Sequence, residues 1–263
     1  FFAPKSITML LEDLKRSLYT PNSPFAFVLG NPIKHSLSPL MHNTAAKSLK
    51  IDLSYFPLQL NLSELQSLPA LMNDELFRGA NITIPYKKEV ISMMDEVDQS
   101  VLKCGAMNTV VKSNTGKLIG YNTDVYGFLS PITPFEDDIE YGHAILFGTG
   151  GASLAVLTAL EKLRISSVTL VSRNPGTYQP HRDYEFDLTM ASYHNWSAYR
   201  NSDTVLMVNA TPLGMLGKEE DSPIALSDVH LMQDCFCYDL VYNPYETTFL
   251  QDAIEHGGRP IFG

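Results

Sequence analysis

The chain is short of positive charge. Its 263 residues include 19 lysines and arginines against 29 aspartates and glutamates, a formal net charge of −10. The basic residues form no run, which argues against nucleic acid or an anionic membrane surface as a partner. No apolar stretch approaches the roughly 18 to 20 residues that a helix needs to cross a bilayer. The sequence therefore predicts a protein that binds neither nucleic acid nor membrane.

Cysteine is also scarce. Cys104, Cys235 and Cys237 form an odd and sparse set, which argues against a disulfide framework and fits a reducing cytoplasm. No second Cys or His pair accompanies Cys235-Phe-Cys237 at metal-ligand spacing, so we expect core thiols and no metal site. Acidic residues interrupt the apolar stretch within residues 1–24, so no signal peptide is expected there.

Apolar periodicity predicts an α/β protein. The spacing over residues 7–19 predicts a helix, so we interpret 1–24 as an N-terminal extension helix. From Phe25 onward, strands alternate with helices, which implies parallel βαβ units. Strands are expected at 25–30, 53–60, 78–84, 143–147, 167–172, 204–209 and 236–242. A hairpin is expected from 106–112 and 117–121, and helices at 38–49, 63–72, 86–95 and 152–163.

Several local signals refine this assignment. Ser38 is expected to cap the second helix with Pro39 at its first position, and Ser63 to cap the third. Residues 130–142 are polar and acidic and contain prolines, so they are interpreted as a connector to a second unit. Residues 174–187 show no regular pattern.

A glycine turn joins the expected strand at 143–147 to the expected helix at 152–163. Gly148 permits the tight turn, and Gly150 and Gly151 let backbone N–H groups approach a pyrophosphate at the helix N-terminus. Ser153 stands where the G-x-G-x-x-G pattern has its third glycine. The strand and helix context predicts a dinucleotide site.

The end of the next strand indicates which dinucleotide is bound. NAD sites usually place Asp or Glu there to bind the ribose 2′-OH, whereas this chain has Ser172, Arg173 and Asn174. A guanidinium can pair bidentately with a 2′-phosphate and stack on adenine. The sequence therefore favours NADP(H).

A lysine follows the strand that ends near Pro85. Proline lacks a donor and fixes its φ, so the strand cannot continue, and Lys87 lies just beyond it. A lysine held beside a turn can act as an acid, a base or an anion ligand. Three further segments fit the same site: Ser36-Leu-Ser38, Asn108-Thr109 and Asn122-Thr-Asp124.

The order and spacing of seven segments from residue 25 to Gly263 resemble the shikimate dehydrogenase family. These segments are Gly30-Asn-Pro-Ile-Lys-His-Ser-Leu-Ser-Pro39, Asn81-Ile-Thr-Ile-Pro-Tyr-Lys87, Gly105-Ala-Met-Asn-Thr109, Gly120-Tyr-Asn-Thr-Asp124, Gly148-Thr-Gly-Gly-Ala-Ser153, Asn209-Ala-Thr-Pro-Leu-Gly214 and Tyr238-Asp-Leu-Val-Tyr242. Each segment alone is a weak signal, whereas their joint order is specific.

The resemblance implies two domains with the active site in the cleft between them. Residues 25–124, with about 259–263, would bind the substrate, and residues 125–258 would form a Rossmann-type NADP domain. The implied activity is the reversible NADPH-dependent reduction of 3-dehydroshikimate to shikimate. Lys87 would move the proton, and Asp124 would orient it. The implied substrate ligands are Ser36, Ser38, Thr83, Lys87, Asn108, Asp124 and Tyr242. The implied cofactor residues are Gly148, Gly150, Gly151, Ala152, Ser172, Arg173, Asn174, Ala210, Thr211, Leu240 and Gly263.

Alternatives stay open at this point. The family often has a second basic residue after the arginine, whereas Pro175-Gly-Thr177 supplies none, so a quinate/shikimate dehydrogenase or an NAD enzyme is a rival. A catalytically weak nucleotide-binding homologue and one half of a fused enzyme are others. The family pattern extends past Gly263 by a Met-Leu pair, a substrate-binding glutamine and a closing helix, which the catalytic domain would need as a strap. Either a monomer or a homodimer is expected.

Overall fold

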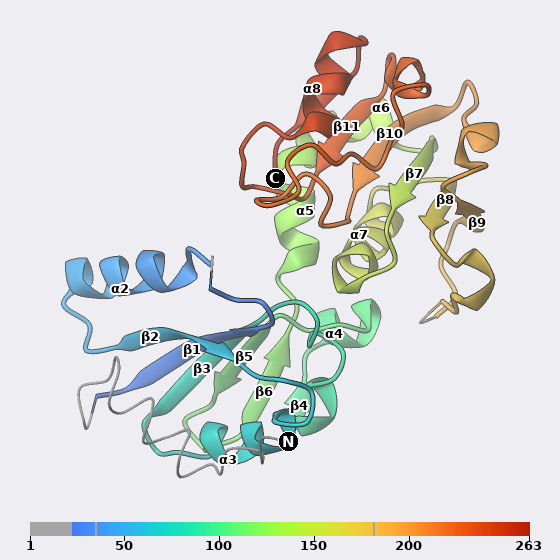
Figure 1. Cartoon of the computed structure of the whole chain (residues 1–263). Coiled ribbons are helices and arrows are strands. Elements are labelled where there is room, and N and C mark those ends of the chain that lie inside the picture. Colours follow the sequence, from blue (N-terminus) through green and yellow to red (C-terminus); the bar gives the residue numbers. More distant parts are fainter. Residues whose placement is uncertain (1–22, 35, 181) are drawn as a thin grey trace. The chain divides into compact units, whose positions relative to one another are not determined.

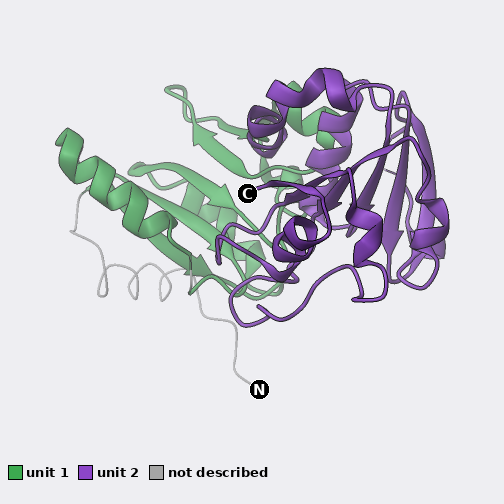
Figure 2. Cartoon of the chain, turned by 90° about the horizontal axis from the view of Figure 1, so that it is seen from above, with its two compact units in different colours: residues 1–123 green, residues 124–263 purple. Residues whose placement is uncertain are grey.

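The chain forms two compact units. A computed structural model describes residues 23–34, 36–180 and 182–263, so the helix expected over 7–19 lies outside the described residues. The first unit ends at Thr123 and the second runs from Asp124 to Gly263 (Figure 2). No helix within the described ranges has both the length and the hydropathy of a bilayer-crossing segment.

The first unit is built on a mixed six-stranded sheet in the order β2-β1-β3-β5-β6-β4 (Figure 1). Its strands are β1 Phe25–Gly30, β2 Ser54–Gln59, β3 Phe77–Ile82, β4 Glu96–Val97, β5 Thr109–Lys112 and β6 Leu118–Tyr121. The strand β1 runs parallel to β2 and β3, whereas β5 runs antiparallel to β3 and β6. The hairpin expected from the turn at 113–116 is confirmed as β5 and β6.

The two faces of this sheet are covered differently. Its helical segments are α2 Ser38–Leu49, η1 Leu65–Ser67, α3 Leu68–Met72, η2 Ile91–Met93 and α4 Gln99–Cys104. One face carries the main aromatic core, where the rings of Phe27 and Phe77 lie 5.4 Å apart. The opposite face carries a smaller cluster that includes Tyr55, and His42 of α2 stacks on this tyrosine at 4.3 Å.

The second unit is a doubly wound parallel sheet in the order β12-β11-β10-β7-β8-β9. Its strands are β7 His143–Phe147, β8 Ser167–Ser172, β9 Asp187–Ser192, β10 Thr204–Asn209, β11 Phe236–Asp239 and β12 Arg259–Ile261. Its helical segments are α5 Asp124–Ile132, η3 Thr133–Phe135, α6 Glu136–Ile139, α7 Gly151–Lys162, η4 Pro175–Thr177, η5 Trp196–Tyr199, η6 Val229–Met232 and α8 Thr248–Glu255. The strand order reverses between β7 and β10, which is where such sheets bind ligands.

Two segments differ from the secondary structure expected from the sequence. The helix expected over 86–95 is a set of turns ending in η2, because the Lys87 carbonyl accepts from the Met107 amide at 2.8 Å. The Ile91 amide donates to Lys88 instead, so no regular helix forms. The connector expected over 130–142 is largely helical, and Phe135 of η3 packs on Phe236 of β11 with ring centroids 5.0 Å apart.

Helix starts and the C-terminus also differ from expectation. Ser38 lies inside α2 and Leu37 occupies the N-cap position. Ser63 caps no helix, since a 3₁₀ turn begins at Leu65 and α3 at Leu68. The segment 259–263 was expected to complete the first unit, whereas its β12 pairs in parallel with β11 of the second. The strand after α8 returns to the same sheet by the usual crossover. The pattern gave no indication of β9, α4 or α8.

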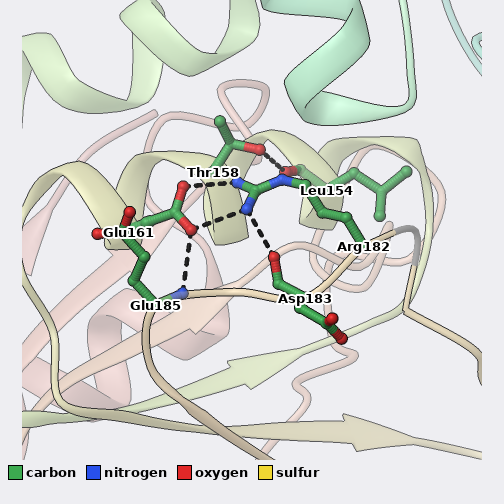
Figure 3. A network of polar contacts seen from close by, with 6 residues as sticks. All are labelled: Leu154, Thr158, Glu161, Arg182, Asp183 and Glu185. Atoms are coloured by element: carbon green, nitrogen blue, oxygen red, sulfur yellow. Dashed lines mark hydrogen bonds and ion pairs between the residues drawn. The ribbon is translucent and has the colours of Figure 1, made fainter.

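A partly buried ion pair ties α7 to the segment before β9 (Figure 3). The Arg182 guanidinium donates to both carboxylate oxygens of Glu161, at 2.8 and 2.6 Å. The same carboxylate accepts from the backbone amide of Glu185 at 3.1 Å. Arg182 also lies over the ring of Tyr184, 4.5 Å from its centroid. The pair therefore shapes a segment that showed no pattern in the sequence.

We predict that Glu161→Gln lowers the free energy of unfolding of the second unit by about 1 to 3 kcal/mol, because Arg182 keeps its charge and loses a bidentate partner. Urea unfolding followed by fluorescence measures this change. The matched control is Glu96→Gln, which breaks the 2.5 Å contact with Lys117 between two largely exposed side chains. The control should change stability by no measurable amount. Equal losses in both variants would contradict the prediction.

Candidate active site

The register of the second sheet aligns a row of residues at its carboxyl edge. Phe147 of β7 pairs with Asn209 of β10, which pairs with Asp239 of β11. The residues that follow these strands are therefore level with one another: Gly148, Ala210 and Leu240. These three residues were predicted to contact the cofactor, and the register brings them side by side.

Two more predicted residues extend this row. Ser172 ends β8 next to Gly148, whose amide donates to the Val171 carbonyl at 3.0 Å. At the other end, a Cβ on Gly263 would meet the carbonyl oxygen of Asp239 at 2.5 Å and the backbone of Leu240 at 3.0 Å. Gly263 thus packs directly on the end of β11.

Gly148 and Gly150 are glycines for different reasons. Gly148 has a φ of +103°, and a Cβ there would meet Thr211 at 3.0 Å and the Ala210 carbonyl at 3.1 Å. The turn itself therefore requires Gly148. Gly150 has an ordinary φ of −79°, and a Cβ there would meet no protein atom within 4 Å. The protein leaves open the space in front of Gly150.

The N-terminus of α7 faces this space without a side-chain cap. Gly150 occupies the N-cap position, Gly151 and Ala152 begin the helix, and its first turn holds no acidic residue. The Ser153 hydroxyl donates back to the Gly150 carbonyl at 2.6 Å and so caps no amide. Uncapped amides and the helix dipole favour an anion there. The open space and the donors fit a dinucleotide pyrophosphate.

The end of β8 exposes a cation. The buried hydroxyl of Ser172 accepts from the Asn174 amide at 3.1 Å, which turns the chain and leaves Arg173 and Asn174 exposed. Burial raises the pKa of nearby Tyr193, and the positive charge of Arg173 partly offsets this rise. Arg182 is held by Glu161 near the C-terminal end of α7, at the opposite edge of the sheet. Arg182 is therefore not a second cation for this edge.

Asn209 and Asp239 fix the loops beside the glycine turn, and neither was predicted as a site residue. The Asn209 carbonyl oxygen accepts from the amide and hydroxyl of Thr211, at 3.0 and 2.6 Å. Its amide group donates to Leu213 and, at 3.0 Å, to Asp239. Both residues belong to segments that carried the family resemblance, which was the only signal for them.

The Asp239 carboxylate is fully buried and hydrogen-bonded. It accepts from the Val241 amide at 2.9 Å and from the Thr247 hydroxyl at 2.6 Å, besides Asn209. Burial raises the pKa of Asp239 above its usual value, and these three donors oppose that rise. Because Val241 is held, the chain direction into Tyr242 is set.

The first unit gathers its own candidate residues around the end of β3. The Thr83 amide donates to Leu29 at 2.8 Å, and Thr83 packs so closely that a Cβ on Gly30 would meet its methyl at 2.5 Å. The Ile82 amide donates to the Asn108 carbonyl at 2.8 Å. With the Met107–Lys87 bond, these contacts place Thr83, Lys87 and Asn108 at one edge of the sheet. The Lys87 side chain is half-buried, whereas its neighbour Lys88 is exposed.

Thr123 forms hydrogen bonds with both ends of the Asn108 carboxamide. Asn108 Nδ2 donates to the Thr123 hydroxyl at 2.8 Å, and Asn108 Oδ1 accepts from the Thr123 amide at 3.0 Å. Asn122 points the other way and donates to Ala106 in the core at 2.9 Å. In the Asn122-Thr-Asp124 segment, Asn122 is therefore bonded into the core, whereas Thr123 holds the Asn108 carboxamide.

Ser36 and Ser38 both lie at the start of α2. The Ser36 hydroxyl oxygen accepts from the Ser38 amide at 3.3 Å, so Ser36 provides the local turn that was assigned to Ser38. Asp124 begins α5, and Tyr242 follows β11, so both belong to the second unit. Their approach to Lys87, and the ligand roles of all these residues, stay predictions.

Cysteines and metal ligands add nothing to this site. Cys104, Cys235 and Cys237 are buried thiols outside any disulfide, which confirms the core thiols expected from the sequence. Among the described residues, no three His, Cys, Asp or Glu side chains are grouped so that they could hold a metal ion.

Comparisons with known proteins identify the family. The substrate-binding domain of shikimate dehydrogenase matches residues 28–110. The NADP(+) shikimate dehydrogenase of Microcystis aeruginosa is 34% identical over 242 residues, which are 90% of this chain and 84% of the relative. The chain belongs to the shikimate dehydrogenase family.

Solved structures agree with this assignment. Shikimate 5-dehydrogenase from Thermus thermophilus, in complex with NADP(H) and shikimate, has a TM-score of 0.72 and 32% identity over 91% of this chain and 87% of its own. Quinate dehydrogenase from Corynebacterium glutamicum, in complex with NAD, has a TM-score of 0.77 and 27% identity over 92% and 88%. The expected two-part α/β fold with a Rossmann-type sheet is confirmed.

We predict that alanine substitutions at Gly148 and Gly150 have different effects, the first on stability and the second on dinucleotide binding. Gly148→Ala should lower the free energy of unfolding by about 1 to 3 kcal/mol, because the residue would need a left-handed φ beside Thr211. Gly150→Ala should leave stability unchanged and weaken dinucleotide binding roughly tenfold or more, since its Cβ enters the open space. Thermal unfolding and cofactor titration measure the two effects. Normal cofactor affinity in Gly150→Ala would show that the space holds no phosphate.

Proposed function

We propose that this protein catalyses the reversible NADPH-dependent reduction of 3-dehydroshikimate to shikimate. One observation carries the proposal. A half-buried Lys87 lies with hydroxyl and carboxamide groups at one sheet edge, in a chain whose other sheet ends in an uncapped glycine turn. A polyhydroxylated acid needs the first set of groups, and a dinucleotide needs the second.

The side chains of the first unit hold and protonate the substrate. Ser36 and Ser38, at the start of α2, bind the substrate carboxylate, where the helix dipole adds a favourable potential. Thr83 and Asn108 bind ring hydroxyls. Lys87 donates a proton to the carbonyl oxygen during reduction and removes it from the hydroxyl during oxidation.

The residues of the second unit hold the cofactor and orient the lysine. The amides at Gly150 and Gly151 bind the pyrophosphate, and Arg173 binds the 2′-phosphate of the adenosine ribose. The bound dinucleotide supplies or accepts the hydride. Asp124 orients Lys87, and Tyr242 closes over the substrate. A cytoplasmic location and a monomeric or homodimeric state complete the proposal.

A quinate/shikimate dehydrogenase that also accepts NAD is the second candidate. The observation that favours it is the ion pair between Arg182 and Glu161. Because Arg182 is held there, it is not available as a second positive charge beside Arg173 for the 2′-phosphate of NADP. The quinate dehydrogenase noted above is bound to NAD. A binding protein without turnover is a third possibility that the same assay addresses.

We predict that Lys87→Met lowers kcat by about 10² to 10⁴ with little change in KM, because it removes the proton carrier and keeps the packing of the stem. Steady-state absorbance of the reduced nicotinamide measures both constants in the full-length polypeptide. The matched control is Lys88→Met, in which an exposed lysine one residue away is changed. Near-normal turnover of Lys87→Met would remove this residue from the mechanism.

A second prediction concerns specificity. With shikimate or quinate crossed against NADP⁺ or NAD⁺, shikimate with NADP⁺ should react fastest. Arg173→Gln should raise the KM for NADP⁺ about tenfold and leave that for NAD⁺ unchanged, since only NADP⁺ carries the phosphate. Comparable rates with quinate or NAD⁺ would establish the second candidate. No reaction in any of the four combinations would refute the enzymatic proposal.

A further inference from the structure

A series of polar side chains runs across the first sheet on the face that carries Tyr55. The Tyr55 hydroxyl donates to Asn81 Oδ1 at 2.6 Å, and Asn81 Nδ2 donates to Thr109 Oγ1 at 3.5 Å. The Thr109 hydroxyl then donates to Asn108 Oδ1 at 2.9 Å. Thr123 completes the series through its contacts with the Asn108 carboxamide.

Each donor in this series sets the direction of the next. A carboxamide can bind with either its oxygen or its amide group toward a neighbour, and a hydroxyl can donate or accept. Because Tyr55 donates to Asn81, the amide group of Asn81 faces Thr109. Thr109 then accepts from Asn81 and sends its own proton to Asn108. If Asn81 were reversed, its oxygen would compete for that proton.

Tyr55 is well placed to be the fixed starting point. Its backbone amide and carbonyl are both bound by the Asn43 carboxamide, at 2.9 and 2.7 Å, and His42 stacks on its ring. The side chain lies under α2, and the residue is 5% exposed. Burial raises the pKa of its hydroxyl, which keeps this group protonated at neutral pH.

We propose that Tyr55 and Thr109 are positioning residues, which orient the Asn108 carboxamide for a substrate hydroxyl through Asn81. This inference rests on the proposed function, because it takes Asn108 as a substrate ligand. Neither Tyr55 nor Thr109 touches the substrate in this scheme. Their effect is on the orientation of one amide, which decides whether a donor or an acceptor meets the substrate.

The test compares Tyr55→Phe, Thr109→Val and the double variant, with Thr109→Ser as the matched control that keeps the hydroxyl. Hydrogen exchange of the Thr123 backbone amide, followed by NMR in the free protein, reports the orientation of Asn108 without any turnover. If Asn108 turns, the Thr123 amide faces an NH₂ group and loses its acceptor. Steady-state kinetics with shikimate and NADP⁺ provides the functional measurement.

We expect exchange of the Thr123 amide to rise at least about fivefold in Tyr55→Phe and in Thr109→Val, and to stay within about twofold of wild type in Thr109→Ser. The KM for shikimate should rise about threefold to tenfold in the first two variants, with the KM for NADP⁺ unchanged. The double variant should show little more than either single change, because both interrupt one series.

Contrary results separate the two hypotheses. Unchanged exchange in folded Tyr55→Phe and Thr109→Val, or fully additive effects in the double variant, would overturn the positioning role. A wild-type protein that does not oxidise shikimate would overturn the proposed function, while the exchange measurement still decides whether Tyr55 orients Asn108. A general loss of protection across the first sheet would show a merely structural role and would also overturn the proposal.

Discussion

The buried carboxylate of Asp239 is the constraint on which the cofactor edge depends. A carboxylate without contact to water must find a hydrogen bond for each oxygen, or its burial costs several kcal/mol. Here the donors come from three directions: Asn209 on the neighbouring strand, the Val241 amide and the Thr247 hydroxyl that begins α8. The two loops that leave β10 and β11 therefore cannot move independently of each other. Gly148 is packed against the first of these loops, so the position of the glycine turn is coupled to the same carboxylate.

In the first sheet, the buried polar groups that need hydrogen-bond partners are neutral. Its series from Tyr55 to Thr123 contains hydroxyls and carboxamides and no formal charge. A buried carboxylate is only an acceptor, so it fixes its neighbours whichever way they approach. A hydroxyl or a carboxamide can be satisfied in two directions, and here the direction is set at both ends, by the Tyr55 hydroxyl and by the Thr123 backbone amide, which can only donate. On the first sheet, Asn43 holds Tyr55 by both its backbone amide and its carbonyl, whereas Asp239 on the second sheet is held by three donors to its carboxylate.

Local sequence patterns correctly predicted the strands that are buried on both faces of their sheets. The runs at β1, β7, β8 and β10 are buried on both faces, so they read as continuous apolar strands. The edge strand β9 alternates between exposed and covered positions and carries Asp187, which is why it resembled a loop. The turns after Lys87 resembled a helix because Tyr86 and Val90 are buried at helical spacing. The Lys87 carbonyl instead accepts from the amide of Met107, twenty residues away in sequence. A prediction from local sequence patterns cannot include such a long-range hydrogen bond.

The same limit applies to the candidate site. Gly148, Gly150 and Arg173 were recognisable because the role proposed for each depends on its own backbone or charge. Tyr55 and Asn209 bind partners that lie in other strands, Asn81 and Asp239, and tyrosine and asparagine at such positions carry no distinctive pattern. The register supplies what the sequence lacks, since pairing of Phe147 with Asn209 and of Asn209 with Asp239 leaves little freedom for the residues that follow. Because β7, β10 and β11 end at the same level, the first residues after them lie side by side in one row. The sheet register is therefore the step at which separate segments of sequence become one binding edge.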